Sequence, residues 1–327
     1  MPGSRFLFSN GILSQTLDVP PVKLFLEANP GAYTTSRTHN NASCLLFWER
    51  HMKRLSESIR ILSNLAPQLL FKSNNAASLL PLAPNFQVSP PALQMLVNDS
   101  VGKVLPIALK ERVNSKELAI TTLVGGNLEE LNIYYKTMSD ENMSKSFDVH
   151  VHIETYVSPR FGIRGNGAHL AVAGYGRNVA AAKYSDWVRI RKTLEKLRPP
   201  SVTELLLSYN GDQILEGCVT NFFVVCRKNF LVCRNEGIPF REVSPSWSEH
   251  ETWEEAFITN SLRLLQHVDS IQVPTEWHSA HFKTWKDISW TKKQFQGGPG
   301  FITTLIQEKV MEKAILEGCP INNICTR

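Results

Sequence analysis

The first half of the chain places its hydrophobic residues at helical and at strand spacings in turn. Helical spacing is clearest between Leu45 and Leu62, where apolar residues recur every three or four positions. Two stretches, Glu117–Val124 and Asp148–Val157, alternate apolar and polar residues as strands do. The other elements expected before residue 157 are a hairpin over Phe6–Leu13, a short helix over Val22–Glu27, a strand over Ala32–Thr38 and a helix within Phe86–Leu109.

A glycine-rich segment, Ser158–Gly167, breaks both spacings. Such a segment often joins domains. We therefore expect a small N-terminal α/β domain over residues 1–157, an interdomain loop over 158–167 and a larger C-terminal domain over 168–327. The expected elements of the last part are strands over His169–Ala173, Glu204–Ser208, Asn221–Cys226 and Glu254–Thr259, and helices over Tyr184–Leu197 and Phe301–Leu316. Because no regular strand–helix–strand rhythm appears, the expected fold class is α/β of the mixed, α+β type.

Composition and charge narrow the classes of partner. The 327 residues carry a formal net charge of +5 without a Lys/Arg-rich block, which argues against nucleic-acid binding. No apolar run approaches the roughly 20 residues of a membrane helix, and we expect no membrane contact. The N-terminus lacks the apolar core of a secretory signal. Since the six cysteines include no CxxC pair, a cytoplasmic chain with reduced thiols is expected.

Two segments of the second half contain the residues that suggest chemistry. The first, Ala182-Lys183-Tyr184-Ser185-Asp186-Trp187, follows an irregular stretch and opens an expected helix. The second runs from Asp212 to Val225 and reads DQILEGCVTNFFVV. Taken alone, a lysine at a helix start is usually a solvated surface residue, and a glutamate before glycine usually lies in a turn.

Together these segments resemble two blocks of the fold-type-IV enzymes that depend on pyridoxal 5'-phosphate (PLP). This family includes branched-chain and D-amino-acid aminotransferases and aminodeoxychorismate lyase. The resemblance implies that Lys183 is the Schiff-base lysine and that Glu216 contacts the pyridine nitrogen. It also implies that Asn221 helps to hold the loop near the cofactor.

Further motifs of the same family occur in the same order along the chain, over roughly residues 5–317. The segment His51-Met52-Lys53-Arg54-Leu55 resembles the family's H-x-x-R-L helix, which implies that Arg54 contacts the cofactor phosphate. The strand from Gly31 to Arg37 resembles a substrate-facing strand, which implies substrate roles for Tyr33 and Arg37. The segment from Glu255 to Leu262 resembles the block whose serine and following amide bind phosphate. By this resemblance the phosphate ligands include Thr259, Ser261 and Leu262, although these residues can also cap a helix from Leu262.

One part of the family pattern is missing. The family places a glycine-to-arginine turn and a helix between its N-i-F strand and its F-l-T-n strand, and that helix start binds phosphate. Here the sequence passes through Arg234-Asn235-Glu236, which looks like the join left by a skipped segment. We expect a plant-like member whose C-terminal domain is shortened there, and which binds PLP weakly or folds poorly.

The resemblance implies a two-domain enzyme of the D-amino-acid aminotransferase-like fold. Its cofactor would be PLP, its substrate a small amino or keto acid, and its assembly a homodimer. We expect an aminotransferase, with aminodeoxychorismate-lyase-type activity as the alternative. A catalytically impaired splice variant or non-catalytic relative also remains open. His278 and His281 have a loose ligand-like spacing, but no further ligand completes a zinc site and no metal is expected.

Overall fold

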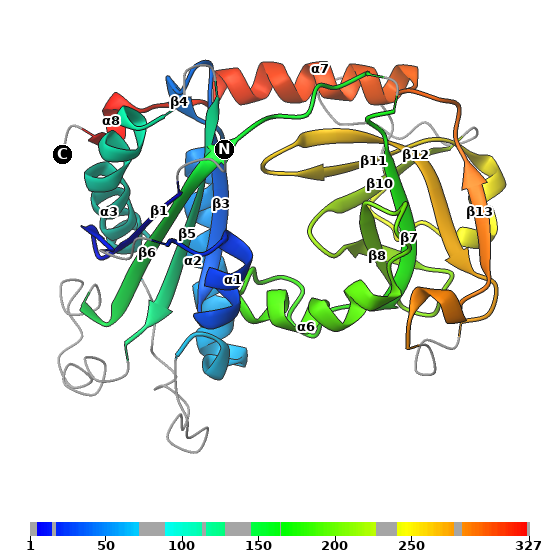
Figure 1. Cartoon of the computed structure of the whole chain (residues 1–327), viewed down its shortest axis with the longest axis horizontal. Helices are drawn as coiled ribbons and strands as arrows, with labels where there is room; N and C mark the ends of the chain where they lie inside the picture. Colours follow the sequence, from blue (N-terminus) through cyan, green and yellow to red (C-terminus); the bar gives the residue numbers. More distant parts are fainter. Residues whose placement is uncertain are drawn as a thin grey trace. The chain divides into compact units, whose positions relative to one another are not determined.

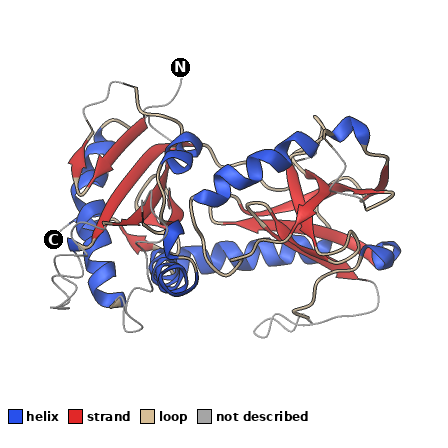
Figure 2. Cartoon of the chain, turned by 90° about the horizontal axis from the view of Figure 1, so that it is seen from below, coloured by secondary structure: helices blue, strands red, loops and turns tan. Residues whose placement is uncertain are grey.

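The computed structural model describes residues 5–14, 18–71, 89–112, 116–127, 145–163, 165–226, 241–277 and 283–325. It divides into two compact units. The first unit comprises Met1–Val157, Val179–Arg189 and Ala314–Arg327, and the second comprises Ser158–Asn178 and Ile190–Lys313. Both units contain helices and strands (Figure 2), as the sequence predicts for a mixed α/β fold.

The first unit is built on a sheet whose seven described strands follow the order β14-β4-β3-β5-β6-β1-β2, with antiparallel neighbours throughout (Figure 1). The expected hairpin near the N-terminus is confirmed, because Asn10 and Gly11 both adopt positive φ angles, of 50° and 77°, as a tight two-residue turn requires. The strands are β1 (Arg5–Ser9), β2 (Ile12–Leu13), β3 (Ala32–His39), β4 (Cys44–Leu45), β5 (Glu117–Gly126), β6 (Phe147–Tyr156) and β14 (Cys319–Pro320).

Helices pack on this sheet through the apolar stripes that the sequence predicts. Helix α2 (Trp48–Leu65) buries Met52, Leu55, Ile59 and Leu62 and packs on β3. It begins three residues later than expected, because Leu45 is taken up by β4. The other helical segments that the structure describes wholly within this unit are α1 (Val22–Ala28), the 3-10 turn η1 (Pro67–Leu69), α3 (Pro90–Lys110) and α8 (Asn322–Cys325).

The second unit is built on a second sheet, in which the described strands follow the order β10-β11-β12-β7-β8-β9, with β13 also paired to β12. Strand β7 lies parallel to both β12 and β8, and the other pairs are antiparallel. The strands are β7 (Ala168–Tyr175), β8 (Glu204–Ser208), β9 (Ile214–Gly217), β10 (Asn221–Cys226), β11 (Trp253–Asn260), β12 (Leu264–Pro274) and β13 (Trp290–Gln294).

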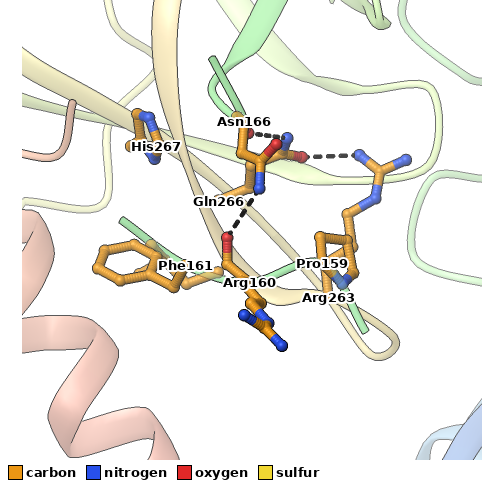
Figure 3. A pocket seen from close by; sticks show the side chains of 8 residues that line it. Pro159, Arg160, Phe161, Asn166, Arg263, Gln266 and His267 are labelled. Carbon is orange, nitrogen blue, oxygen red and sulfur yellow. Dashed lines mark hydrogen bonds between the residues drawn. The ribbon is translucent and has the colours of Figure 1, made fainter. Parts of the chain in front are cut away.

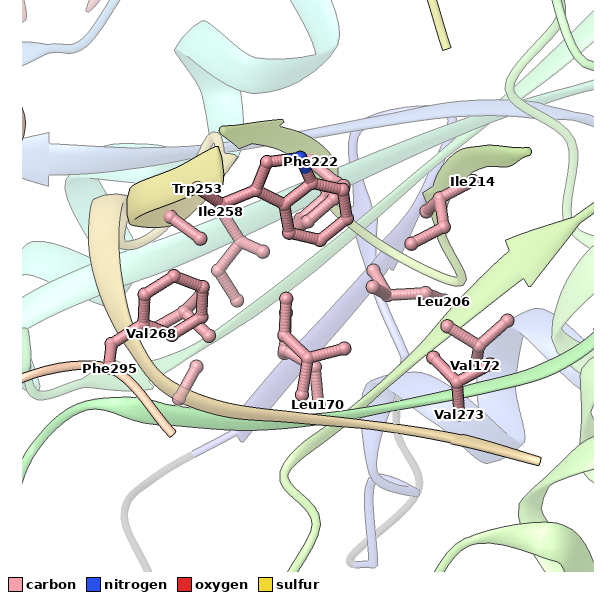
Figure 4. Packing of buried hydrophobic residues seen from close by; sticks show 13 residues of the cluster. Leu170, Val172, Leu206, Ile214, Phe222, Trp253, Ile258, Val268, Val273 and Phe295 are labelled. Atoms are coloured by element: carbon pink, nitrogen blue, oxygen red, sulfur yellow. The ribbon is translucent and has the colours of Figure 1, made fainter. Parts of the chain in front are cut away.

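The core of the second unit forms where aliphatic and aromatic side chains of these strands meet (Figure 4). Phe222 of β10 and Trp253 of β11 contact each other edge to face, with ring centroids 6.2 Å apart. Leu170 and Val172 of β7 and Leu206 of β8 belong to the same cluster and are fully buried. A central strand buried in this way explains the apolar run of β7, since parallel strands are usually covered on both faces.

The described part of the chain contains further helical segments. Helix α6 (Asp186–Leu194) and the 3-10 turn η3 (Glu195–Leu197) together cover most of the expected helix over Tyr184–Leu197. Helix α7 (Phe301–Leu316) has the expected bounds. Two further 3-10 turns are η4 (Trp247–Thr252) and η5 (Trp285–Asp287). Among the described helices, none combines the length and the apolar character that crossing a membrane demands.

The structure differs from the expectations at two points. A helix from Leu262 is wrong, because β12 begins at Leu264 and forms a hairpin with β11. The chain also does not divide at a single boundary, because each unit is built from segments that are separated in the sequence. Residues 179–189 and 314–327 belong to the first unit although they follow the expected boundary, so that Lys183 lies in the first unit. The second unit therefore has fewer residues than the first, whereas the C-terminal domain was expected to be the larger. The join at 234–236, and His278 with His281, lie outside the described residues.

Candidate functional site

Main-chain hydrogen bonds hold the segment around Lys183 against the start of β3. The amide of Tyr33 donates to the carbonyl of Lys183 at 3.0 Å, and the amide of Ser185 donates to the carbonyl of Gly31 at 2.9 Å. Ala32 and Tyr184 form an isolated antiparallel bridge between these two contacts. Lys183 is thereby fixed beside a strand that lies about 150 residues earlier in the sequence, which local periodicity does not reveal.

Helix α2 provides a further support for Lys183. The amide of Lys183 donates to Oγ of Ser58 at 3.0 Å, and the same hydroxyl donates to the carbonyl of Arg54 at 2.8 Å. Ser58 is fully buried. Its hydroxyl uses both its donor and an acceptor position in these two contacts, so it links the lysine segment to the helix.

Replacing Ser58 by alanine is expected to lower the free energy of unfolding by about 1–3 kcal/mol, because the Lys183 amide then lacks an acceptor in a partly buried position. Urea denaturation of the two proteins measures the change. Ser56→Ala on the same helix is the matched control and should change the free energy of unfolding much less. Equal effects of the two substitutions would contradict a role for the Ser58 hydroxyl.

The side chain of Lys183 lies over an aromatic ring. Its Nζ atom is 4.8 Å from the centroid of the Tyr33 ring, within the range of a cation–π contact. Tyr33 is buried and packs with Phe25, Leu26 and other apolar residues. Since the Lys183 residue is itself only half-buried, its amine lies at the border of an apolar cluster.

His51 lies close enough to Lys183 and Arg54 for their positive charges to act on it. Its Nδ1 atom lies 2.7 Å from Oγ1 of Thr34 on β3. Burial, together with the positive charges of Lys183 and Arg54, lowers the pKa of His51 to about 3. His51 is therefore neutral at physiological pH, and the positive charges that act on it belong to the exposed Arg54 and to Lys183. Such an arrangement of cationic groups is suited to a phosphate or a carboxylate.

Arg37 is the least accessible of the predicted residues in this unit. It is 3% exposed and its Nη1 atom donates to the carbonyl of Thr38 at 3.2 Å. Its guanidinium also lies 5.8 Å from the centroid of the Tyr156 ring. Burial lowers the pKa of Arg37 from its usual value. These contacts stabilise the strand, and a substrate role for Arg37 stays a prediction.

In the second unit, Glu216 forms a two-pronged ion pair that the sequence does not predict. Nε of Arg177 lies 2.8 Å from Oε1 of Glu216, and Nη2 of Arg177 lies 2.8 Å from Oε2. The two side chains are 9% and 21% exposed, respectively. Glu216 lies on β9 opposite Leu207 of β8, whereas Arg177 follows β7. The sequence around Arg177 reads as an irregular loop, so no local signal identifies this partner.

The remaining predicted residues lie on the β10–β11–β12 part of the same unit. Asn221 is directly opposite Thr259 in the sheet, and its Nδ2 atom donates to the Thr259 hydroxyl at 3.4 Å. In the turn that contains Ser261, Oδ1 of Asn260 accepts the amides of Leu262 at 3.1 Å and of Arg263 at 2.8 Å. The turn is therefore held by its own asparagine side chain.

A pocket of the second unit lies beside this turn but contains none of the predicted residues (Figure 3). Nε2 of Gln266 donates to the carbonyl of Asn166 at 2.8 Å, and Nη1 of Arg263 donates to Oε1 of Gln266 at 2.9 Å. This chain of contacts ties the segment before β7 to the start of β12. In the part of the chain that the structure describes, no cluster of three or more metal-ligating side chains occurs.

The structure thus distributes the predicted residues over the two units. In the first unit it brings Tyr33, Arg54 and Lys183 together around α2 and the start of β3. In the second unit it pairs Asn221 with Thr259 near the turn of Ser261 and Leu262. The two residues that sequence reasoning missed are Ser58 and Arg177.

Comparison with solved structures identifies the fold. The branched-chain amino acid aminotransferase of Escherichia coli matches with a TM-score of 0.59 and 15% identity, covering 97% of this chain and 99% of that one. The 4-amino-4-deoxychorismate lyase of Pseudomonas aeruginosa matches with a TM-score of 0.54 and 14% identity, covering 94% and 98%. An aminotransferase from Brucella abortus, bound to the cofactor PLP, matches with a TM-score of 0.55 and 11% identity, covering 95% and 99%.

No protein-family model and no curated protein matches this sequence. The structural matches extend over nearly the whole of each chain, so the likeness is one of complete folds and not of a single domain. The chain therefore has the two-domain fold of the fold-type-IV enzymes, which confirms the fold that the sequence motifs imply.

Proposed function

We propose that this chain is a PLP-dependent aminotransferase of the fold-type-IV group, with Lys183 as the lysine that binds the cofactor. The observation that carries the proposal is the way Lys183 is held. Its main chain bonds the Tyr33 amide and the Ser58 hydroxyl, and the neighbouring Ser185 amide bonds the Gly31 carbonyl. Its amine lies over the Tyr33 ring in a region that includes the charge of Arg54. The fold is that of an aminotransferase solved with bound PLP.

The residues present fit this cofactor. When bound, PLP supplies an electron sink for the carbanion that forms at the substrate α-carbon. Lys183 provides the primary amine that can bond to the cofactor aldehyde and, once released, can move the α-proton. Arg54 provides a fixed positive charge for the phosphate. Glu216 provides a carboxylate for the ring nitrogen, and Arg177 holds the plane of that carboxylate through a two-pronged ion pair.

The remaining phosphate and substrate contacts are also part of the proposal. Thr259, Ser261 and the amide of Leu262 would contact the phosphate, and Asn221 would hold the neighbouring loop. Support comes from the ordered turn that Asn260 maintains and from the pairing of Asn221 with Thr259. Tyr33, whose ring lies beside the Lys183 amine, would face the amino- or keto-acid substrate, together with Arg37. The proposed assembly is a homodimer, which light scattering of the purified protein tests.

Lyase activity is the second candidate, because a 4-amino-4-deoxychorismate lyase shares the fold. In both reactions Lys183 would move the α-proton. The two activities differ in their products. An aminotransferase releases a keto acid from the amino donor, whereas the lyase alternative releases an aromatic product and pyruvate.

Absorbance of the purified protein with added PLP is the decisive measurement. We expect a visible band that survives gel filtration and that an amino donor bleaches, and a screen of donors then identifies the product class. A protein that stays colourless would contradict the proposal and favour the impaired or non-catalytic alternative.

The expected shortening near residues 234–236 is tested in the same experiment. A second protein carries a Gly-x-x-Arg helix inserted between Cys233 and Glu236. If the shortening weakens phosphate binding, the longer protein retains more PLP, because each charge-assisted hydrogen bond contributes about 1.5–3 kcal/mol. Equal retention by the two proteins would refute the weakening.

A further inference from the structure

The ion pair of Arg177 and Glu216 is more sheltered from solvent than a comparable two-pronged pair on the surface of α2. Both oxygens of Glu216 accept hydrogen bonds from one guanidinium, each at 2.8 Å. The Arg177 side chain is 9% exposed. By contrast, Arg60 bonds Glu57 in the same two-pronged manner on the surface of α2, where the two side chains are 57% and 49% exposed. A surface pair contributes little, whereas a sheltered planar pair fixes the orientation of both groups.

We propose that Arg177 is a positioning residue for Glu216 and that its charge lowers the proton affinity of the cofactor ring nitrogen that Glu216 contacts. This inference rests on the proposed function. Arg177 itself touches neither substrate nor cofactor in this proposal. It acts through the carboxylate, by holding its plane and by balancing its charge.

The Glu216 carboxylate can accept hydrogen bonds from Arg177 and from the ring nitrogen at the same time. An ionised carboxylate has about four lone-pair positions, and Arg177 uses one on each oxygen. The remaining positions can accept a proton donor such as a protonated ring nitrogen. Glu216 therefore need not lose its arginine when the cofactor binds.

The charges around the ring nitrogen determine whether Arg177 raises or lowers its pKa. A lone carboxylate beside the ring nitrogen favours the protonated, cationic ring because opposite charges attract. With Arg177 bonded to it, the carboxylate belongs to a pair of zero net charge, and the guanidinium repels the cationic ring. The ring nitrogen therefore holds its proton less tightly than it would beside Glu216 alone.

Other titratable groups surround this part of the unit. Burial raises the pKa of the Cys218 thiol to about 12, so this neighbour on the loop after β9 stays neutral. The charged groups that act on Cys218 besides Glu216 are Glu204, Glu195 and Arg191. Burial raises the pKa of Glu204 to about 7. The Glu204 charge therefore changes in the neutral range, and pH titrations of the ring nitrogen need Glu204→Gln as a background that removes this change.

The test measures protonation of the ring nitrogen directly. PLP labelled with 15N at the ring is bound to the wild-type protein and to the variants Arg177→Met, Arg177→Lys and Glu216→Gln, each also prepared with Glu204→Gln. The 15N chemical shift is followed from about pH 5 to pH 9. In Arg177→Met the apparent pKa of the ring nitrogen should rise by at least about one unit, a tenfold gain in proton affinity. It should stay near the wild-type value in Arg177→Lys and fall in Glu216→Gln.

Controls separate this effect from loss of structure. Arg60→Met removes the comparable surface pair and should leave the nitrogen pKa unchanged. Arg177→Gln replaces Arg177→Met if the latter does not fold, because it also removes the charge, and thermal unfolding of each variant without cofactor reports the folding.

An unchanged or lowered nitrogen pKa in the charge-removing variant overturns the inference and leaves the proposed function intact. Failure of the wild-type protein to bind PLP overturns both.

Discussion

Replacing Lys183 by alanine should abolish the visible absorbance of the PLP-loaded protein and lower the rate of amino transfer by about 10²–10⁴-fold or more, because in the proposed function the residue provides both the covalent anchor and the proton-transferring amine. The substitution removes a side chain whose amine lies over the Tyr33 ring, but it keeps the main-chain contacts with Tyr33 and Ser58. The variant should therefore fold. Absorbance after gel filtration and single-turnover kinetics measure the two effects.

Two further variants sharpen this prediction. Lys183→Arg retains a positive charge beside Tyr33 but provides no primary amine, so it should behave like the alanine variant. Lys196→Ala, at an exposed position of η3, should retain colour and activity. A visible band in Lys183→Ala would show that another lysine binds the cofactor and would remove the basis of the proposed function.

Acidification below about pH 6.5 should destabilise the first unit steeply. The unfolded chain protonates its histidines near pH 6.5. Burial and the charges of Lys183 and Arg54 lower the pKa of folded His51 to about 3. Burial also lowers the pKa of His150 and of His152. Between these pKa values the unfolded state binds more protons than the folded state, so the free energy of unfolding falls as the pH falls.

The magnitude follows from the number of protons. Each histidine that stays neutral in the folded state and protonates on unfolding contributes a slope of about 1.4 kcal/mol per pH unit. Urea titrations at pH 7.5, 6.5, 5.5 and 5.0 measure the total slope. In His51→Gln, which can still bond Thr34, the slope should decrease by up to one such contribution. A slope that does not change in this variant would contradict the neutral state of His51.

In the second unit, Glu204 contributes a free energy of unfolding that increases as the pH falls. Its pKa is raised by burial to about 7, so its folded form binds a proton that the unfolded form has already lost above about pH 4.5. The stabilisation from this proton is fully present at acidic pH and disappears as the pH rises towards 7. Burial also lowers the pKa of His267 in the second unit, so this histidine and Glu204 act in opposite directions there. Hydrogen exchange, which probes each unit, should therefore show a smaller loss of stability on acidification in the second unit than in the first.

Local sequence determined many of the elements. The strands Glu204–Ser208 and Asn221–Cys226 and the helix Phe301–Leu316 have the expected bounds, because residue types that favour each element and flanking turn residues act over a few positions. The stripe of Met52, Leu55, Ile59 and Leu62 likewise predicts the face of α2 that is buried. The order of the motifs also indicated the fold, which the solved structures confirm.

Strand β12 shows where local sequence was insufficient. Leu264–Pro274 contains His267, Asp269 and Ser270, which are polar residues that interrupt an apolar strand pattern. All three are nevertheless buried, because β12 lies between β11 and β7 in the sheet. Only the neighbouring strands make such a segment a central strand, since burial there depends on pairing and not on the residues alone.

The surroundings of the proposed site were decided by tertiary structure. The resemblance of the motifs predicts Lys183 and Glu216 as the reactive groups. It did not indicate that Tyr33 and Ser58 hold the lysine segment in the first unit, or that Arg177 bonds the glutamate, 39 residues away. Hydrogen bonds and ion pairs form between groups that the fold brings within about 3 Å. Because that proximity depends on the whole chain, a single sequence predicts candidate reactive groups here but not the partners that orient them.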